Sequence, residues 1–225
     1  MIEPVTIGRA TLYNADCADV LKQFPECHGV CATVMDPPYG IKAASRGTIG
    51  TSKAGKVKDY GAATWDNETV DFSLLESFFK LSSWQIVFGG NYYPMPASSC
   101  WLVWDKVNSG DFADCELAWT NLPKAVRLRR YMWNGMLREK GAQRGDHPTQ
   151  KPLEIMKWCI EQLPADVETI IDPFAGSGTT GVAAIQMGKR FIGIEREEKY
   201  FQAMCRRIRE TNGDDAGPLF IEAAQ

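Results

Sequence analysis

Short apolar runs, most of them separated by segments of helical periodicity, constrain the fold of this chain more than any other feature. The runs are Ala10–Tyr13, Val30–Met35, Gln85–Phe88, Trp101–Trp104, Thr169–Ile171 and Phe191–Ile194. Such runs are typical of strands that are buried on both faces. Strands of this kind that are separated by helices form a largely parallel sheet with helices on both sides. The sequence therefore predicts an α/β fold.

Four segments have the residue pattern of helices that would cover this sheet. Phe72–Leu81, Leu153–Leu163 and Glu198–Glu210 carry apolar residues at a spacing of three or four. Gly176–Met187 consists mainly of small residues and follows a glycine turn, which predicts a fourth helix. Residues 212–225 have the composition of a loose tail. A length of 225 residues suits a single domain with insertions.

Positive charge is concentrated in two windows, although the whole chain has a net charge of −3. Residues 42–58 carry +5 and residues 121–151 carry +6, so the rest of the chain carries −14. This asymmetry favours one surface that faces a polyanion, and two solvated basic loops are the alternative. Residues 42–61, rich in Gly, Ser, Thr and Lys, are predicted to form a mobile loop.

Residues 126–133 alternate in a way that predicts a strand with two different faces. Val126, Leu128 and Met132 would lie on the apolar face. Arg127, Arg129, Tyr131 and Trp133 would lie on the other face. Arginine and aromatic side chains can bind phosphates and stack on bases, so this face is a candidate for binding nucleic acid. A polar hairpin face without such a role is the alternative.

Other features point to a cytoplasmic protein without a metal site. No apolar run is long enough to span a bilayer, and the N-terminus lacks the pattern of a secretion signal. The seven cysteines are scattered and odd in number, which favours reduced thiols. Cys27, His28 and Cys31 offer only three ligands and lead into an apolar strand, so we expect no metal there.

The tetrapeptide Asp36-Pro37-Pro38-Tyr39 directly follows the predicted strand Val30–Met35. Ligands of open α/β sheets bind beyond the carboxyl ends of the strands. Two successive prolines restrict the backbone and leave acceptors, the Asp36 carboxylate and nearby carbonyl groups. Such acceptors can hold the hydrogens of an exocyclic amine and stabilise positive charge during its attack, while Tyr39 can stack on a base. A simple turn is the alternative.

A glycine-rich loop with the sequence DPFAGSGTT runs from Asp172 to Thr180, after the predicted strand Thr169–Ile171. Glycine lets the backbone approach a ligand closely. The loop lacks the ending of a phosphate-binding P-loop and the spacing of a dinucleotide fingerprint. Glu195 ends the next strand, 23 residues after Asp172, close to the spacing at which an acidic residue meets ribose hydroxyls. The combination predicts a nucleoside ligand.

Together, DPPY at residues 36–39 and FAGSG at residues 174–178 resemble the motifs of the amino-group DNA methyltransferases, which act on adenine N6 or cytosine N4. DPPY precedes FAGSG, and HPTQKP at residues 147–152 lies between them, an order similar to that of the beta class. Further matching segments are Asn14–Cys17, Phe88–Tyr93 and Leu102–Lys106. The resemblance covers essentially the whole chain. It implies a single Rossmann-like S-adenosylmethionine-dependent methyltransferase domain with a circularly permuted motif order.

The resemblance also implies where the cofactor binds. The FAGSG loop would surround the methionine part of S-adenosylmethionine, Glu195 would bind its ribose and Asp16 its adenine amine. Thr149 and Lys151 would lie near its carboxylate, and Asp36 between its methyl group and the target amine. A helix cap at Asp16 and a solvated Lys151 are the alternatives. The implied cofactor-binding residues are Asp16, Cys17, Asp36, Thr149, Lys151, Asp172, Phe174, Ala175, Gly176, Ser177, Gly178 and Glu195.

In this family an Asp in the tetrapeptide goes mostly with adenine and a Ser mostly with cytosine. The resemblance therefore implies site-specific transfer of a methyl group to N6 of a flipped adenine in double-stranded DNA, by direct in-line displacement. Methylation of N4 of cytosine, methylation of an RNA or protein amine, and a non-catalytic DNA- or cofactor-binding module are the alternatives. The implied catalytic residues are Asp36, Pro37, Pro38 and Tyr39. The candidate DNA-binding residues are Lys42, Arg46, Lys53, Lys56, Arg127, Arg129, Tyr131 and Trp133.

The order of the motifs divides the chain into functional parts. Residues 1–120 would form the catalytic half, residues 121–146 a short target-recognition insert, residues 147–211 the cofactor-binding half, and residues 212–225 the tail. We expect a bacterial or phage-encoded cytoplasmic enzyme that forms a homodimer. A restriction endonuclease partner is not determinable from one chain.

Overall fold

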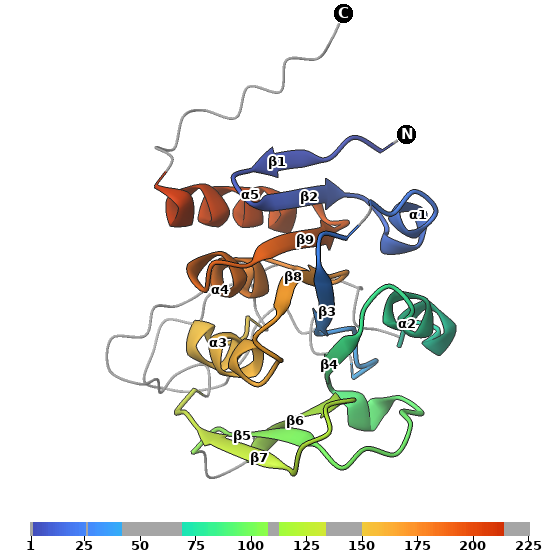
Figure 1. Cartoon of the computed structure of the whole chain (residues 1–225), viewed down its shortest axis with the longest axis vertical. Helices are drawn as coiled ribbons and strands as arrows, with labels where there is room; N and C mark the ends of the chain where they lie inside the picture. Colours follow the sequence, from blue (N-terminus) through green and yellow to red (C-terminus); the bar gives the residue numbers. More distant parts are fainter. Residues whose placement is uncertain (1, 26, 42–68, 108–112, 134–149, 214–225) are drawn as a thin grey trace, which may run out of the picture.

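The computed structural model describes residues 2–25, 27–41, 69–107, 113–133 and 150–213. Within these ranges the strands form a single sheet in the order β1-β2-β9-β8-β3-β4-β6-β5-β7 (Figure 1). The strands are β1 (Val5–Ile7), β2 (Ala10–Asn14), β3 (Val30–Met35), β4 (Trp84–Phe88), β5 (Trp101–Asp105), β6 (Cys115–Thr120), β7 (Arg127–Arg130), β8 (Val167–Asp172) and β9 (Arg190–Glu195). The predicted loop at residues 42–61 lies outside the described residues.

Most strands of the sheet point in the same direction. β2, β9, β8, β3 and β4 are parallel neighbours in that order. β6 is antiparallel to both β4 and β5, so β5 points the same way as β4, and β7 is parallel to β5. Only β1 and β6 among these strands run the opposite way. The predicted, mostly parallel sheet is confirmed. Its parallel strands bring their carboxyl ends to one edge, where β6 begins.

Helices cover both faces of the sheet, as predicted. α3 (Leu153–Glu161), α4 (Thr179–Gln186) and α5 (Glu198–Asn212) lie on one face, and α1 (Cys17–Leu21) and α2 (Phe72–Phe79) on the other (Figure 1). β3 contributes side chains to the hydrophobic cores on both faces of the sheet. Its Ala32 and Val34 belong to the core under α3, α4 and α5, whereas Cys31 and Met35 belong to the core under α1 and α2. This is the two-residue alternation of a strand that is buried on both faces.

Some element boundaries differ from those expected. β1 and β6 were not predicted, because β1 has three residues and the apolar run of β6 is interrupted by Glu116. α4 begins at Thr179 rather than Gly176, since Gly178 has a left-handed backbone with φ 79°. α5 includes Asn212 and is capped by Gly213 at φ 76°, so the tail does not begin at Asn212.

The prediction for residues 126–133 is wrong in its extent and in its faces. Only the four residues of β7 are strand, and its Leu128 is 60% exposed instead of buried. Val126 is also exposed, whereas Tyr131 and Trp133 are partly buried against the core. The physical reason is the position of β7 at the end of the sheet, where β5 is its one partner among the described strands.

Among the described residues, no helix has both the length and the hydropathy needed to cross a membrane.

The core under α2 makes a test of the fold. Phe78 is 0% exposed, and its ring meets Phe24 edge to face with centroids 6.0 Å apart. We expect Phe78→Ala to lower the free energy of unfolding by about 3–5 kcal/mol, because it leaves a cavity in a packed core. Urea unfolding followed by circular dichroism measures this loss. Leu128→Ala, at an exposed residue, is the control and should change stability by less than about 0.5 kcal/mol. Equal effects of the two substitutions would contradict this core.

Candidate active site

The two sequence motifs lie side by side at the carboxyl edge of the sheet. Asp36 follows β3, and Asp172 is the last residue of β8. β3 and β8 are hydrogen-bonded parallel neighbours, so the DPPY segment and the glycine loop leave the sheet next to each other. Glu195 ends β9, which is the next strand beyond β8. In an open α/β sheet this edge is where ligands bind.

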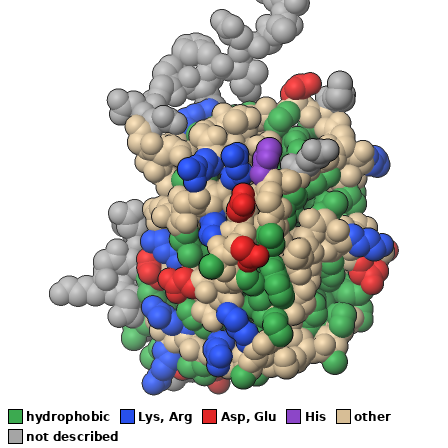
Figure 2. Space-filling model, viewed as in Figure 1, with side chains coloured by type: hydrophobic (Ala, Val, Ile, Leu, Met, Phe, Trp, Pro, Cys, Tyr) green, Lys and Arg blue, Asp and Glu red, His purple; other side chains and the backbone are tan. Residues whose placement is uncertain are grey.

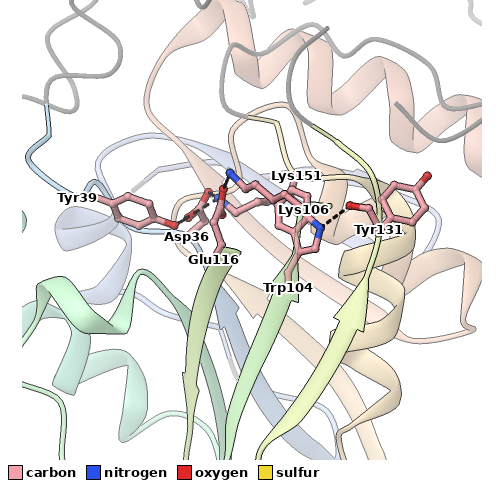
Figure 3. Close-up of polar contacts among 7 residues, drawn as sticks. All are labelled: Asp36, Tyr39, Trp104, Lys106, Glu116, Tyr131 and Lys151. Carbon is pink, nitrogen blue, oxygen red and sulfur yellow. Dashed lines mark hydrogen bonds and ion pairs between the residues drawn. The ribbon is translucent and has the colours of Figure 1, made fainter. Parts of the chain in front are cut away.

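The Asp36 carboxylate is engaged at both of its oxygens. The Tyr39 hydroxyl donates a hydrogen bond to Oδ1. The Lys151 ammonium donates to Oδ2 at 2.6 Å. Lys151 also lies 3.4 Å from the Tyr39 hydroxyl oxygen, and these three side chains point toward one another in Figure 3. The structure thus brings together residues of DPPY and of HPTQKP that are far apart in the sequence.

A second carboxylate, on β6, completes this group. Glu116 Oε2 lies 3.1 Å from the Lys151 ammonium, and Glu116 Oε1 lies 2.5 Å from the ammonium of Lys106. Negative and positive side chains therefore alternate in space, in the order Asp36, Lys151, Glu116 and Lys106 (Figure 3). The Lys151 side chain is only 8% exposed. The resemblance implied that Lys151 lies near a cofactor carboxylate. In this structure two carboxylates of the protein compensate its charge, as burial of an ammonium requires, so the alternative of a solvated Lys151 is wrong. Its place near a cofactor carboxylate stays a prediction.

The pairing shifts the pKa values of the buried groups. Burial alone would lower the pKa of Lys151, but the charges of Asp36 and Glu116 outweigh it and raise this pKa above its ordinary value. Burial would raise the pKa of Glu116, but Lys151 and then Lys106 bring this pKa below its ordinary value. Lys151 and Glu116 are consequently both charged at neutral pH.

Tyr39 is held by a neighbouring turn. Its ring stacks on that of Tyr92 in the 3₁₀ turn η2 (Gly90–Tyr92), with centroids 5.0 Å apart and 15° between the planes. The Tyr93 hydroxyl donates to the carbonyl of Pro38 and ties the same turn to DPPY. Burial, followed by the charges of Asp36 and Glu116, raises the pKa of Tyr39 well above its ordinary value, so its hydroxyl is a neutral donor.

Gly89 provides the space that the Tyr39 ring occupies. Its φ is 64°, and a Cβ at this position would lie 2.1 Å from Tyr39 Cε1. Gly89→Ala should therefore cost more than the roughly 1–2 kcal/mol of a left-handed alanine, because the ring must also move. Gly188→Ala is the matched control, since Gly188 has φ 73° and nothing within 4 Å of an added Cβ. Urea unfolding of both variants measures the difference. Equal losses would mean that the ring moves aside without cost.

The glycine loop is shaped by two carboxylates. Asp172 is 2% exposed and accepts a hydrogen bond from the Phe174 N–H at 3.0 Å, so it faces the loop that it precedes. Glu195 Oε2 accepts from the Gly176 N–H at 2.9 Å, and its Oε1 accepts from the Glu197 N–H at 2.7 Å. Both carboxylates therefore organise the backbone of the loop.

The other side of the loop is fixed by α5 and by the segment before α3. Ser177 donates to Gln150 Oε1 at 2.9 Å. Arg207 donates to the Ser177 carbonyl at 2.6 Å and to Thr179 Oγ1 at 3.1 Å. Ser177 and Ala175 are buried, and a Cβ on Gly178 would lie 2.6 Å from Met204 Cγ. Small residues thus let the loop pass close to the helix.

Asp16 lies at the end of the strand next to β9. It caps α1 by accepting from the Ala18 N–H at 2.8 Å, and its role toward the adenine amine of a cofactor stays a prediction. Its side chain is exposed, and Asn14 of β2 pairs in register with Glu195. Asp16 and Glu195 are therefore carboxylates at the ends of neighbouring strands. Burial, followed by the charge of Asp16, raises the pKa of Cys17 to about 12, so this thiol stays protonated.

The candidate DNA-binding residues are only partly described. Lys42, Arg46, Lys53 and Lys56, and the candidate cofactor residue Thr149, lie outside the described residues. Arg127 and Arg129 are exposed on β7, and Figure 2 shows Lys and Arg side chains toward that end of the molecule. Tyr131 and Trp133 pack partly against the core, so they are not a fully open stacking face. The carbonyl of Tyr131 accepts from Trp104 Nε1 at 2.9 Å (Figure 3).

Sequence reasoning missed Glu116 and the stacking role of Tyr92. Glu116 is a lone acidic residue in a strand that was not predicted. Tyr92 lies in the Phe88–Tyr93 segment that matches the family, but nothing in the pattern indicates that it contacts Tyr39. The Glu116 contact depends on the pairing of β6 with β4, and the Tyr92 contact depends on the pairing of β4 with β3.

The pKa of Asp172 gives a test of the loop. Burial raises this pKa to about 7 from 3.8, and hydrogen bonds from Thr180 and Phe174 oppose the rise. Because the folded pKa lies above the unfolded one, the stability from this group is full below about pH 4 and is lost as the pH rises through about 7. The free energy of unfolding of the protein should therefore decrease between about pH 5 and pH 8. The same quantity measured for Asp172→Asn should decrease less, because the variant lacks the titrating group. Urea unfolding at both pH values measures this, with exposed Asp166→Asn as control. Identical slopes in protein and variant would contradict the burial of a titrating Asp172.

The chain is similar in sequence to known DNA methyltransferases. A family model described as DNA methylase, of the N6/N4 type, matches residues 101–206. The Type II methyltransferase M2.DpnII of Streptococcus pneumoniae is 42% identical over 82 residues, which are 36% of this chain and 31% of that protein. M2.LlaDCHI of Lactococcus lactis subsp. cremoris is 42% identical over 78 residues, 34% of this chain and 29% of that protein. The matches thus span less than a third of each relative.

Solved structures match the fold over most of the chain. The M1.HpyAVI–SAM complex has a TM-score of 0.57 at 24% identity, covering 88% of this chain and 99% of that one. PvuII DNA methyltransferase, described as cytosine-N4-specific, has a TM-score of 0.56 at 16% identity, covering 93% of this chain and 92% of that one. These likenesses establish the fold. Together with the family match over residues 101–206, the curated relatives confirm the resemblance of the motifs to the N6/N4 amino DNA methyltransferases.

Proposed function

We propose that this protein transfers the methyl group of S-adenosylmethionine to N6 of adenine in double-stranded DNA. One observation carries the proposal. The Asp36 carboxylate leaves β3 directly beside the glycine loop that leaves β8, so a polar acceptor and a nucleoside cradle share one edge of the sheet. The sequences of both segments resemble those of amino DNA methyltransferases.

The residues around the glycine loop fit S-adenosylmethionine. Gly176 and Gly178 have φ of 53° and 79°, so the loop turns without side chains that would keep a ligand away. Asp16 and Glu195 supply carboxylates at the ends of neighbouring strands, one suited to an adenine amine and one to ribose hydroxyls. When bound, this cofactor supplies an electrophilic methyl group. The M1.HpyAVI–SAM complex has the same fold and supports this choice.

The DPPY residues then act on the target amine. We assign the Asp36 carboxylate as the acceptor for an amine hydrogen, because it carries negative charge and directly follows β3 at the carboxyl edge of the sheet. An anionic acceptor stabilises the positive charge that grows on nitrogen during attack and can take the proton that the product loses. The ring of Tyr39, stacked on Tyr92, offers the aromatic surface for a flipped base.

The choice of adenine rests on Asp36, because an Asp in this position goes mostly with adenine in the family. Curated relatives named as Type II methyltransferases support DNA as the substrate. The exposed Arg127 and Arg129 of β7 are suited to phosphate contacts. PvuII methyltransferase shares the fold and is described as cytosine-N4-specific, so N4 of cytosine is the second candidate.

The test uses purified protein, S-adenosylmethionine and unmethylated plasmid, followed by digestion to nucleosides and mass spectrometry. We expect N6-methyladenine from the protein and at least a 100-fold smaller yield from Asp36→Ala, because the charge-stabilising acceptor is lost. Asp105→Asn, which removes a carboxylate from an ion pair with Arg130 at the same sheet edge, is the control and should retain activity.

The products separate the candidate functions. N4-methylcytosine instead of N6-methyladenine would keep the acceptor role of Asp36 and overturn the choice of base. If cofactor binds, as measured by calorimetry, but no methylated base forms, the proposed reaction on DNA is wrong. Assays on RNA and protein substrates then follow.

A further inference from the structure

The Lys151 ammonium lies between two carboxylates that have different surroundings. On one side is Asp36, which the proposed function assigns to the target amine, at 2.6 Å. On the other is Glu116 at 3.1 Å, which is itself fixed by Lys106 at 2.5 Å. The Lys151 side chain is almost completely buried, and its ammonium also lies over the rings of Phe88 and Tyr39 at 5.1 and 5.5 Å from their centroids.

This arrangement creates a conflict when a base binds. Both oxygens of Asp36 have donors, the Tyr39 hydroxyl and the Lys151 ammonium. A carboxylate oxygen can accept more than one hydrogen bond, but an amine that approaches Oδ2 competes with the buried ammonium for the same negative charge. An ammonium as buried as that of Lys151 cannot be left without a counter-charge, because an unpaired buried charge is strongly destabilising.

We propose that Glu116 is a positioning residue that holds the Lys151 ammonium when the Asp36 carboxylate turns to the target amine. This inference rests on the proposed function and adds a residue outside DPPY and the glycine loop. Glu116 is suited to the task because its two oxygens have separate partners. Oε1 is fixed by Lys106, while Oε2 lies within ion-pair distance of Lys151 before any base arrives.

The positions of Glu116 and Asp36 in the fold support this role. Glu116 lies on β6, which pairs with β4 and β5, so the sheet fixes its position independently of DPPY. Asp36, by contrast, lies beyond the last residue of β3 and takes no part in the pairing of the strands. When Asp36 adjusts to a base, Glu116 therefore stays in place and gives Lys151 a constant anionic partner. Without it, Lys151 would remain bound to Asp36 and compete with the amine.

The test compares Glu116→Gln with the unmodified protein in steady-state methylation of plasmid DNA. Glutamine has the same shape but no charge, so Lys151 should stay on Asp36 and kcat should fall at least ten-fold. The KM for S-adenosylmethionine should change less than two-fold, because Glu116 lies beside Lys151 and not in the glycine loop. Glu154→Gln, an exposed ion-paired glutamate on α3, is the matched control and should retain full turnover.

A double-mutant comparison tests whether Glu116 acts through Lys151. Glu116→Gln should cause no further loss of kcat in a Lys151→Met background, because the ammonium that it controls is gone. Glu116→Asp, which keeps the charge with a shorter reach, should recover part of the activity of Glu116→Gln. Cofactor affinity by calorimetry and the thermal unfolding midpoint show whether each variant is folded.

The outcomes separate this inference from the proposed function. If the unmodified protein methylates DNA and Glu116→Gln has the same kcat, the role of Glu116 is wrong and the proposed function stands. Additive losses in the double variant, or a loss of kcat that follows a loss of folding or cofactor affinity, would also overturn the positioning role. If the unmodified protein methylates no DNA, both proposals fail together.

Discussion

A buried ammonium must have anionic neighbours, and in this protein that requirement connects three parts of the chain. Lys151 precedes α3, Asp36 follows β3 and Glu116 lies on β6. The cost of burying a charge is several kcal/mol unless opposite charge and hydrogen bonds compensate it. The pairing therefore acts as a constraint on the fold: the loop before α3, the DPPY segment and β6 must all reach one point above the sheet edge.

The sheet makes this meeting possible because parallel strands end at the same edge. β3, β8 and β9 deliver Asp36, the glycine loop and Glu195, while β6 begins at that edge and delivers Glu116. Glycines then set how closely the segments approach. Gly89 makes room for the Tyr39 ring, and Gly178 lets the loop pass beside Met204 of α5. Strand direction thus brings the polar residues of the site to one edge, and the glycines determine how closely their segments pack there.

The sequence was sufficient for the parts of the molecule that repeat a simple pattern. β3 has the predicted bounds, and α2 and α3 begin at the predicted residues, because continuous apolar runs and helical spacing depend on burial alone. The motifs also placed Asp36 and the glycine loop at strand ends. Glu116 could not be found in this way, since its role depends on the register of β6 against β4 and β5. Leu128 was misassigned for a related reason: alternation alone does not reveal that β7 lies at the end of a sheet.

The order of the strands also affects how the chain can fold. β8 and β9 come after all the other strands in the sequence, yet they lie between β2 and β3 in the sheet. Until they are synthesised, β2 and β3 each have an unpaired apolar edge, and edges of this kind pair readily with other chains. Contacts between residues so distant in sequence also form slowly. Nascent chains therefore pass through a stage with two exposed strand edges, in which protection by a chaperone would have its greatest effect.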